Sequence, residues 1–107
     1  MRRDPFQAIA DPSRRAIVSL LILHAMTPNA LAEHFNTTRQ AVSKHIKILT
    51  ECELVKPRPD GREIFYELNP VKLKEIADWL APFKQLWEAR FNELDTILEQ
   101  LKNKQHE

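Results

Sequence analysis

The sequence contains a single glycine, Gly61, among its 107 residues. Phosphate-cradling loops and dinucleotide-binding turns need several glycines, because the backbone has to approach the ligand closely there. Chemistry that depends on a bound nucleotide is therefore not expected, and no cofactor is predicted. The single cysteine, Cys52, excludes an intramolecular disulfide and a cysteine-rich zinc site.

Long apolar runs are missing as well. No stretch approaches the roughly 20 apolar residues that span a bilayer, and no charged segment followed by an apolar one forms a leader. We expect a cytoplasmic protein with no membrane partner. With 43% hydrophobic and 29% charged residues, residues 1–107 are expected to form one domain, short enough for part of its apolar surface to need a partner subunit.

The net charge is small, +1, from 16 lysines and arginines against 15 aspartates and glutamates. Any affinity for nucleic acid must therefore come from a local excess of positive charge. Residues 36–62 provide one, with six basic against three acidic side chains, whereas residues 88–107 have three basic against five acidic. The basic segment is the place to look for a binding face.

Prolines mark the expected helix starts. Because proline at the first helical position loses no hydrogen bond, a capping residue followed by proline predicts a helix N-terminus. The pairs are Asp4-Pro5, Asp11-Pro12, Thr27-Pro28 and Asn69-Pro70. They predict helices over about 5–10, 12–24 and 28–35, and a helical region from residue 70. The helix over 12–24 is apolar on nearly every side beyond its first turn, so we expect it to be the central core helix.

The segment from Phe35 to Leu54 predicts an amphipathic helix with one packing face and one free face. Val42, Ile46 and Leu49 recur at helical spacing, and the polar and basic side chains fall opposite them. The free face holds Arg39, Gln40, Ser43, Lys44 and Lys47. A Thr37-x-x-Gln40 capping box, or alternatively Thr38 as N-cap, starts this helix.

Two readings of this helix follow. An ordinary solvated surface helix shows the same division of faces. However, a short helix, a polar turn of a few residues and then a basic amphipathic helix is the order of a helix-turn-helix, whose second helix reads DNA. In that reading Gln40 contacts an adenine edge unless the capping box occupies it.

Beyond Leu54 the apolar side chains recur every second residue, as in a β-strand, and a hairpin is predicted. Asp60-Gly61 is a turn signal, and Ile64, Tyr66 and Leu68 alternate with other side chains. Prolines in the first strand require it to be an edge. The basic residues at the tip, Lys56, Arg58 and Arg62, make the hairpin a candidate wing that touches phosphates or a minor groove, the alternative being a solvated tip.

The C-terminal region is expected to be helical, with Ala81-Pro82 a kink or a junction between two helices. Beyond it an apolar heptad stripe continues for about three repeats. This stripe favours a homodimer, the alternative being that it folds back on the second helix of its own chain. The predicted dimer interface consists of Phe6, Leu80, Phe83, Trp87, Phe91, Leu94, Ile97, Leu98 and Leu101.

Four segments together resemble the ArsR-type winged-helix repressors of bacteria. In order they are IADPSRRAIVSLL, TRQAVSKHIKILTECELV, DGREIFYEL and DWLAPFKQLWEARFNEL. The likeness extends over nearly the whole chain. The resemblance implies a cytoplasmic dimer, nucleoid-associated when it is bound to a palindromic operator and usually a repressor. It also implies DNA contacts at the positions of Arg39, Gln40, Ser43, Lys44 and Arg62.

The chain departs from the metal-sensing members of that family. The helix PNALAEHF lacks their paired cysteines, and the C-terminal helix has no histidine before His106. No metal site is predicted, which points to the metal-independent branch that includes autorepressors. Arg14 and Arg15, in the shared opening block, are interpreted as surface or phosphate contacts.

The expected fold is mainly α with a two-stranded β wing: a winged helix-turn-helix, dimeric through its terminal helices, with residues 70–104 dimerising. The expected function is sequence-specific regulation of transcription through double-stranded DNA, and no catalytic set is present. The predicted DNA-binding residues are Thr38, Arg39, Gln40, Ser43, Lys44, Lys47, Arg58 and Arg62.

Four other features have competing interpretations. A winged helix used only for protein association would expose apolar anchors on the face that is basic here. His45 is expected to be packed and hydrogen-bonded rather than a base reader. Cys52 is expected to be inert rather than a redox sensor, because Glu51 and Glu53 would raise its pKa. Trp79, Phe83 and Trp87 are interpreted as packing residues rather than a small-molecule pocket, so no ligand is specified.

Overall fold

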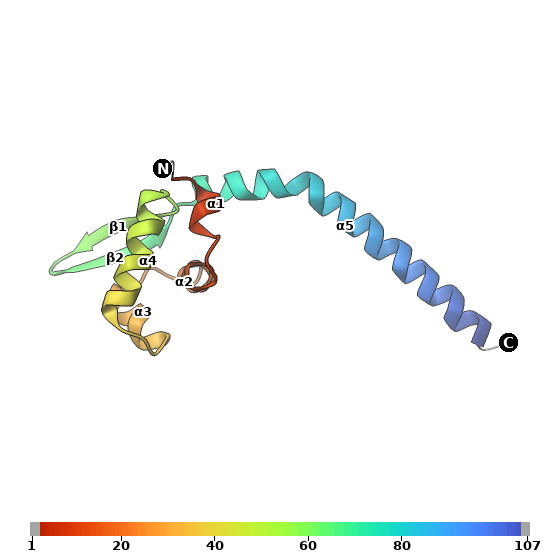
Figure 1. Ribbon diagram of the computed structural model, residues 1–107, viewed down its shortest axis with the longest axis horizontal. Helices are drawn as coiled ribbons and strands as arrows, with labels where there is room; N and C mark the ends of the chain where they lie inside the picture. Colours follow the sequence, from red (N-terminus) through yellow and green to blue (C-terminus); the bar gives the residue numbers. More distant parts are fainter. Residues whose placement is uncertain (1–2, 106–107) are drawn as a thin grey trace. The chain divides into compact units, whose positions relative to one another are not determined.

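The computed structural model describes residues 3–105. Seven elements follow in order: α1 (Pro5–Ala8), α2 (Pro12–Leu21), α3 (Pro28–His34), α4 (Arg39–Glu51), β1 (Val55–Asp60), β2 (Glu63–Leu68) and α5 (Pro70–Gln105) (Figure 1). The predicted class, mainly α with a two-stranded antiparallel hairpin, is confirmed. Residues 3–76 form one compact unit and residues 77–105 a second, so the division falls within α5.

The first three helices begin where the capping residues and prolines predict. In each, a side-chain oxygen of the N-cap residue accepts a hydrogen bond from the backbone N–H three residues later, at 2.9–3.1 Å. The caps are Asp4, Asp11 and Thr27, and each is followed by a proline within the first turn. Local chemistry therefore sets these helix starts.

The core lies between α2, α3, α4 and the start of the hairpin. Its largest fully buried side chains include Leu31, Leu49 and Leu54. The expectation that α2 is buried on most sides is wrong at its C-terminal end, because the helix stops at Leu21 and Ile22 and Leu23 beyond it are exposed. Elsewhere in α2 the buried positions form one stripe.

The hairpin places its proline-bearing strand at an edge, as predicted. Asp60 pairs with Glu63, so the two-residue turn consists of Gly61 and Arg62, one position later than the Asp60-Gly61 signal indicated. Gly61 has φ +63°, a conformation that glycine adopts without strain. Strand β2 is bridged on its other side by Met26, whose backbone exchanges hydrogen bonds of 3.2 and 2.8 Å with Tyr66.

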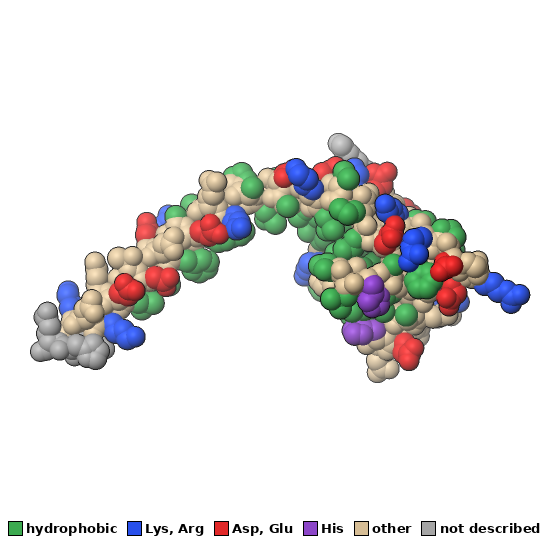
Figure 2. Space-filling model, turned by 180° about the vertical axis from the view of Figure 1, so that it is seen from behind, with side chains coloured by type: hydrophobic (Ala, Val, Ile, Leu, Met, Phe, Trp, Pro, Cys, Tyr) green, Lys and Arg blue, Asp and Glu red, His purple; other side chains and the backbone are tan. Residues whose placement is uncertain are grey.

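Helix α5 runs through Pro82 without interruption, so the C-terminal region is one helix and the alternative of a junction between two helices is wrong. Its first turns belong to the compact unit, since Ile76 is buried in the core and Leu73 packs against it. In the second unit, apolar side chains follow the helix between charged ones, and those described are exposed (Figure 2). No helix of the described chain has the length and apolarity required to cross a bilayer.

Candidate nucleic-acid interface

Helix α4 divides into the two faces that its sequence predicts. Val42, Ile46 and Leu49 are buried in the core. All five members of the opposite face are exposed: Arg39, Gln40, Ser43, Lys44 and Lys47. None of these five side chains has a hydrogen bond or ion pair within the described residues, so their donors and charges face solvent. We call these five the α4 polar face.

The N-cap of α4 is Thr38, whose Oγ1 accepts a hydrogen bond of 3.1 Å from the Ala41 N–H. The Thr37-x-x-Gln40 capping box is therefore wrong, since Thr37 stands one residue before the cap. As a consequence the amide of Gln40 is not occupied by capping. The hydroxyl of Thr38, in contrast, is already an acceptor and has its O–H left to donate.

The two predicted arginines of the wing differ in their surroundings. The Nε atom of Arg58 lies 3.5 Å from a carboxylate oxygen of Glu67, and its guanidinium lies 5.3 Å from the ring centroid of Phe65. Lys56 lies 3.9 Å from the other oxygen of the same carboxylate. Arg62 occupies the turn and has no such partner among the described residues. Its charge is the less neutralised of the two.

A groove of about 300 Å³ separates α4 from the wing and brings predicted residues from both elements together. It is lined by Thr27, Pro28, Asn29, Arg39, Ser43, Arg62, Glu63, Ile64 and Tyr66. Arg39, Ser43 and Arg62 thus share one concave surface. A neighbouring cavity shares Ser43 and Tyr66 and adds Lys47. We call the two together the reading groove. Thr38, Gln40, Lys44 and Arg58 do not line it.

Several polar residues of the reading groove were not predicted from the sequence: Thr27, Asn29, Thr50, Glu51, Glu63 and Tyr66. Asn29 is exposed in the first turn of α3, and Tyr66 is partly buried on β2. The position of Asn29 at the start of the first helix of the helix-turn-helix was a usable signal. Tyr66 gave none, because strand alternation does not indicate which element its ring will face.

Arg14 and Arg15 are engaged at the end of α1. The Nε and Nη2 atoms of Arg14 donate to the carbonyls of Ala8 and Gln7 at 2.9 and 3.1 Å, and Arg15 donates to the carbonyl of Ile9 at 2.8 Å. All three carbonyls lie at the C-terminal end of α1, where a helix leaves backbone acceptors without intrahelical donors or only weakly satisfied. Both arginines therefore cap α1, and the exposed Arg15 also fits the surface position interpreted from the sequence.

Asp11 and His45 connect the start of α2 with α4. The backbone N–H of Arg14 lowers the pKa of the Asp11 carboxyl, burial opposes this shift, and the charges of Arg14 and His45 add to it. The Nδ1 atom of His45 lies 3.9 Å from the Asp11 carboxylate. This nitrogen is buried without a hydrogen bond, so His45 is packed as predicted but the expected hydrogen bond is missing.

Cys52 caps the C-terminus of α4 and is buried. Burial is the main cause that raises the pKa of its thiol, and not the neighbouring glutamates that the sequence suggested. Within residues 3–105, no three side chains of histidine, cysteine, aspartate or glutamate gather as metal ligands would.

The predicted dimer residues are exposed apolar side chains. Phe6 belongs to α1 in the first unit, and the other eight follow α5 in the second, with exposed fractions of 37–61%. Six α5 members recur in steps of three and four residues, interrupted only at Arg90: Leu80, Phe83, Trp87, Leu94, Ile97 and Leu101. Phe91 and Leu98 widen the row. We call these eight residues the α5 stripe. So much exposed apolar surface on one helix is typical of a protein interface.

Known proteins resemble the chain over most of its length. A family model described as a helix-turn-helix domain matches residues 9–58. The transcriptional repressor SdpR of Bacillus subtilis is 38% identical over 78 residues, which are 73% of this chain and 87% of SdpR. An arsenical resistance operon repressor of Staphylococcus aureus is 37% identical over 68 residues, 64% of this chain and 65% of that repressor. A crystal structure of a possible transcriptional regulator for arsenical resistance has a TM-score of 0.68 and 41% identity, covering 80% of this chain and 86% of that one.

Proposed function

The chain belongs to the ArsR-type winged helix-turn-helix transcriptional regulators, which bind DNA, and within that family we propose that it is a repressor acting as a homodimer on an inverted-repeat operator. One observation carries the proposal: the α4 polar face is exposed, basic and without partners among residues 3–105. A face that serves only solubility needs no such set of hydrogen-bonding side chains at the N-terminal turns of the helix.

In the proposed complex, α4 enters the major groove, which is wide enough to admit a helix. Arg39 and Gln40 are nearest the N-terminus of α4 and read base edges, arginine favouring guanine and glutamine favouring adenine. Ser43 supports this readout from the next turn. Lys44 and Lys47 bind phosphates and fix the register.

The wing and the helix cap have secondary roles in this proposal. Arg62 at the turn reaches the neighbouring backbone or minor groove. Arg58 contributes less to DNA binding, because the carboxylate of Glu67 partly neutralises its charge. The Oγ1 atom of Thr38 accepts the capping hydrogen bond of α4, and its hydroxyl proton is donated to a phosphate.

The α5 stripe and Phe6 form the proposed dimer interface. Burying apolar side chains of a heptad stripe against a second copy removes them from water. A two-fold dimer would then hold two α4 helices about one DNA turn, roughly 34 Å, or a multiple of it apart. An inverted-repeat operator follows from this symmetry.

We propose further that repression does not depend on a bound metal and that the protein works in the cytoplasm, at the nucleoid when bound to its operator. The residues that support metal independence are those of the described chain: its cysteine is buried, and its histidines and carboxylates do not cluster. These observations support our proposal that the chain is one of the metal-independent members of the family.

Fluorescence-anisotropy titration of the purified protein against its own upstream DNA and a scrambled duplex, at two salt concentrations, tests the function. Tighter binding to the upstream DNA is expected for an autorepressor, with an affinity that falls steeply with salt because phosphate contacts release counterions. Equal, salt-dependent binding to both duplexes would place the operator elsewhere. Absence of binding to either would contradict the proposal and favour an association module.

Substitutions on α4 test the residue assignment. Arg39→Ala or Gln40→Ala should cost roughly 1–3 kcal/mol on the operator and relax specificity at one base position. Lys84→Ala, an exposed lysine of α5 paired with Glu88, is the control for lost charge and should leave operator affinity unchanged. Unchanged binding by both α4 variants would show that the reading face is elsewhere.

A further inference from the structure

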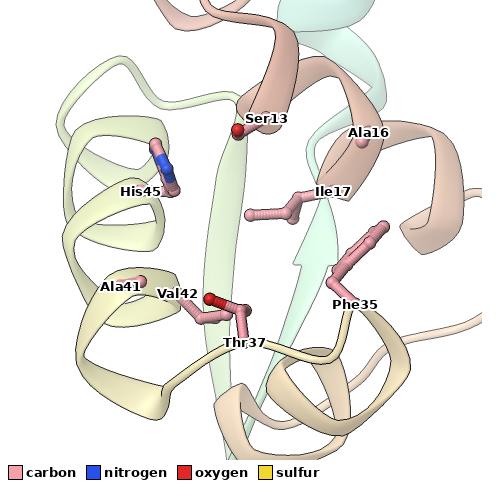
Figure 3. A pocket seen from close by; sticks show the side chains of 8 residues that line it. All are labelled: Ser13, Ala16, Ile17, Phe35, Thr37, Ala41, Val42 and His45. Carbon is pink, nitrogen blue, oxygen red and sulfur yellow. The ribbon is translucent and has the colours of Figure 1, made fainter.

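A cavity separate from the reading groove, of about 290 Å³, lies between α2 and α4 within the compact unit (Figure 3). It is lined by Ser13, Ala16, Ile17, Phe35, Thr37, Ala41, Val42 and His45. None of these residues lines the reading groove. The cavity therefore borders a different side of the helix that carries the α4 polar face.

The walls of this cavity are apolar and its polar groups are few. Ile17 and Phe35 face the space from α2 and from the turn before α4 (Figure 3). The hydroxyls of Ser13 and Thr37 lie at its edges and make no hydrogen bond to other described residues. Apolar walls with a few unpaired polar groups are the usual make-up of a small-molecule site.

The charges around the cavity favour an uncharged occupant. Its lining contains no lysine, arginine, aspartate or glutamate. The carboxylate of Asp11 lies 3.9 Å from Nδ1 of His45, so a negative charge borders the lining on this side. A carboxylate ligand would find no cation here and would be repelled by Asp11.

We propose that this cavity binds small neutral aromatic alcohols, the phenol class. An aromatic ring fills the apolar space, and its O–H donates to the hydroxyl oxygen of Ser13. Ligand pockets usually have volumes of about 300 Å³ or more. Because this cavity is at the lower end of that range, its occupant is limited to about one ring. The molecule would touch α4 directly, on the side away from the reading groove.

Titration of the uniformly ¹⁵N-labelled full chain, followed by two-dimensional NMR, tests the proposal without DNA. The probe is phenol, with anisole as the same ring without an O–H donor and benzoate as the charged analogue. Phenol should shift backbone signals of the lining residues and saturate with a dissociation constant on the order of millimolar. Anisole and benzoate should bind at least about threefold more weakly. Shifts centred elsewhere, or equal affinity for all three, would overturn the proposal.

Two variants localise the binding. Ser13→Ala removes one hydroxyl and should weaken phenol about three- to tenfold, whereas Ser19→Ala, on an exposed part of the same helix, should not. Ala16→Leu fills the cavity from an exposed position of α2 and should abolish binding. The spectrum of each variant shows whether it is folded. Unweakened phenol binding by folded Ala16→Leu would contradict the assignment.

Discussion

At the scale of single residues, the surroundings of a side chain decide whether its charge is available. Arg58 and Arg62 are four positions apart in one hairpin and look equivalent in the sequence. Arg58 lies beside a carboxylate and an aromatic ring, whereas Arg62 has no such neighbour in the part of the chain that the structure describes. Surface ion pairs contribute little stability, but they lower the positive potential that a phosphate would meet.

Arg62→Ala is therefore expected to weaken operator binding more than Arg58→Ala. The loss at Arg62 should be roughly 1 kcal/mol, similar for all sequences, with the slope of affinity against salt reduced by about one phosphate contact. Anisotropy titrations of both variants at several salt concentrations measure this. Equal losses for the two would mean that the Glu67 pairing opens when DNA binds.

Cys52 gives a prediction for thiol chemistry. Burial raises the pKa of the Cys52 thiol, so the folded state favours the protonated thiol over the thiolate. The stability that this preference contributes is fully present below the pKa of an unfolded cysteine, about 8.5. It is lost as the pH rises through the pKa of the thiol in the folded state. Iodoacetamide at pH 8 should alkylate the native protein at least about tenfold more slowly than the urea-unfolded chain. Mass spectrometry of timed samples measures both rates, and equal rates would contradict burial of the thiol.

At the scale of elements, the ends of the helices are defined by backbone geometry. Glu53 follows the C-cap of α4 with φ +60°, and the Leu54 N–H donates to the Leu49 carbonyl at 3.0 Å. This is the Schellman arrangement, in which glycine is the preferred residue. Asn36 has φ +51° after α3, and asparagine tolerates that conformation better than glutamate does.

Glu53→Gly should accordingly stabilise the fold by roughly 0.5–1 kcal/mol, because glycine adopts a positive φ without strain. The exposed ion pair of Glu53 with Lys72, at 3.4 Å, offsets little of this gain. Glu51→Gly, two residues earlier and inside α4, is the matched control and should destabilise by a similar amount. Urea denaturation of the three proteins measures the free energies of unfolding; a loss of stability in Glu53→Gly would show that the positive φ is not strained.

At the scale of the whole molecule, the exposed apolar surface concentrates on α5. The compact unit buries its own core, whereas the α5 stripe has side chains as large as Trp87 and Phe91 in contact with solvent. A stripe of this kind on one helix favours association with a second copy.

Replacing Trp87 and Leu94 together by serine should produce a folded monomer that binds half-sites weakly. The reason is that both side chains belong to the heptad positions that would be buried between two α5 helices. Light scattering after gel filtration measures the mass, and anisotropy measures half-site affinity. Val71→Ser, which removes an exposed apolar side chain of α5 outside the stripe, should leave the dimer intact. An intact dimer in the double variant would contradict the interface, and a monomeric wild type would favour the stripe folding back on its own chain.

Much of the fold follows from short-range patterns. An aspartate or threonine before proline determines where α1, α2 and α3 begin, because the capping hydrogen bond involves residues only three apart. Apolar spacing likewise determines which side of α4 is buried. Most of the candidate site was predictable for the same reason, since the α4 polar face is simply the side opposite those apolar positions.

The tertiary structure alone decided the features that depend on residues distant in the chain. Arg14 and Arg15 cap α1 because the end of that helix lies against α2, and Tyr66 joins the reading groove because β2 lies beside Met26 and α3. Thr38 rather than Thr37 caps α4, since the polar turn after α3 determines where the chain enters the helix. The sequence by itself thus determined the helices, the wing and the basic face through local hydrogen bonding and periodicity, whereas packing decided which charges are neutralised and where cavities form.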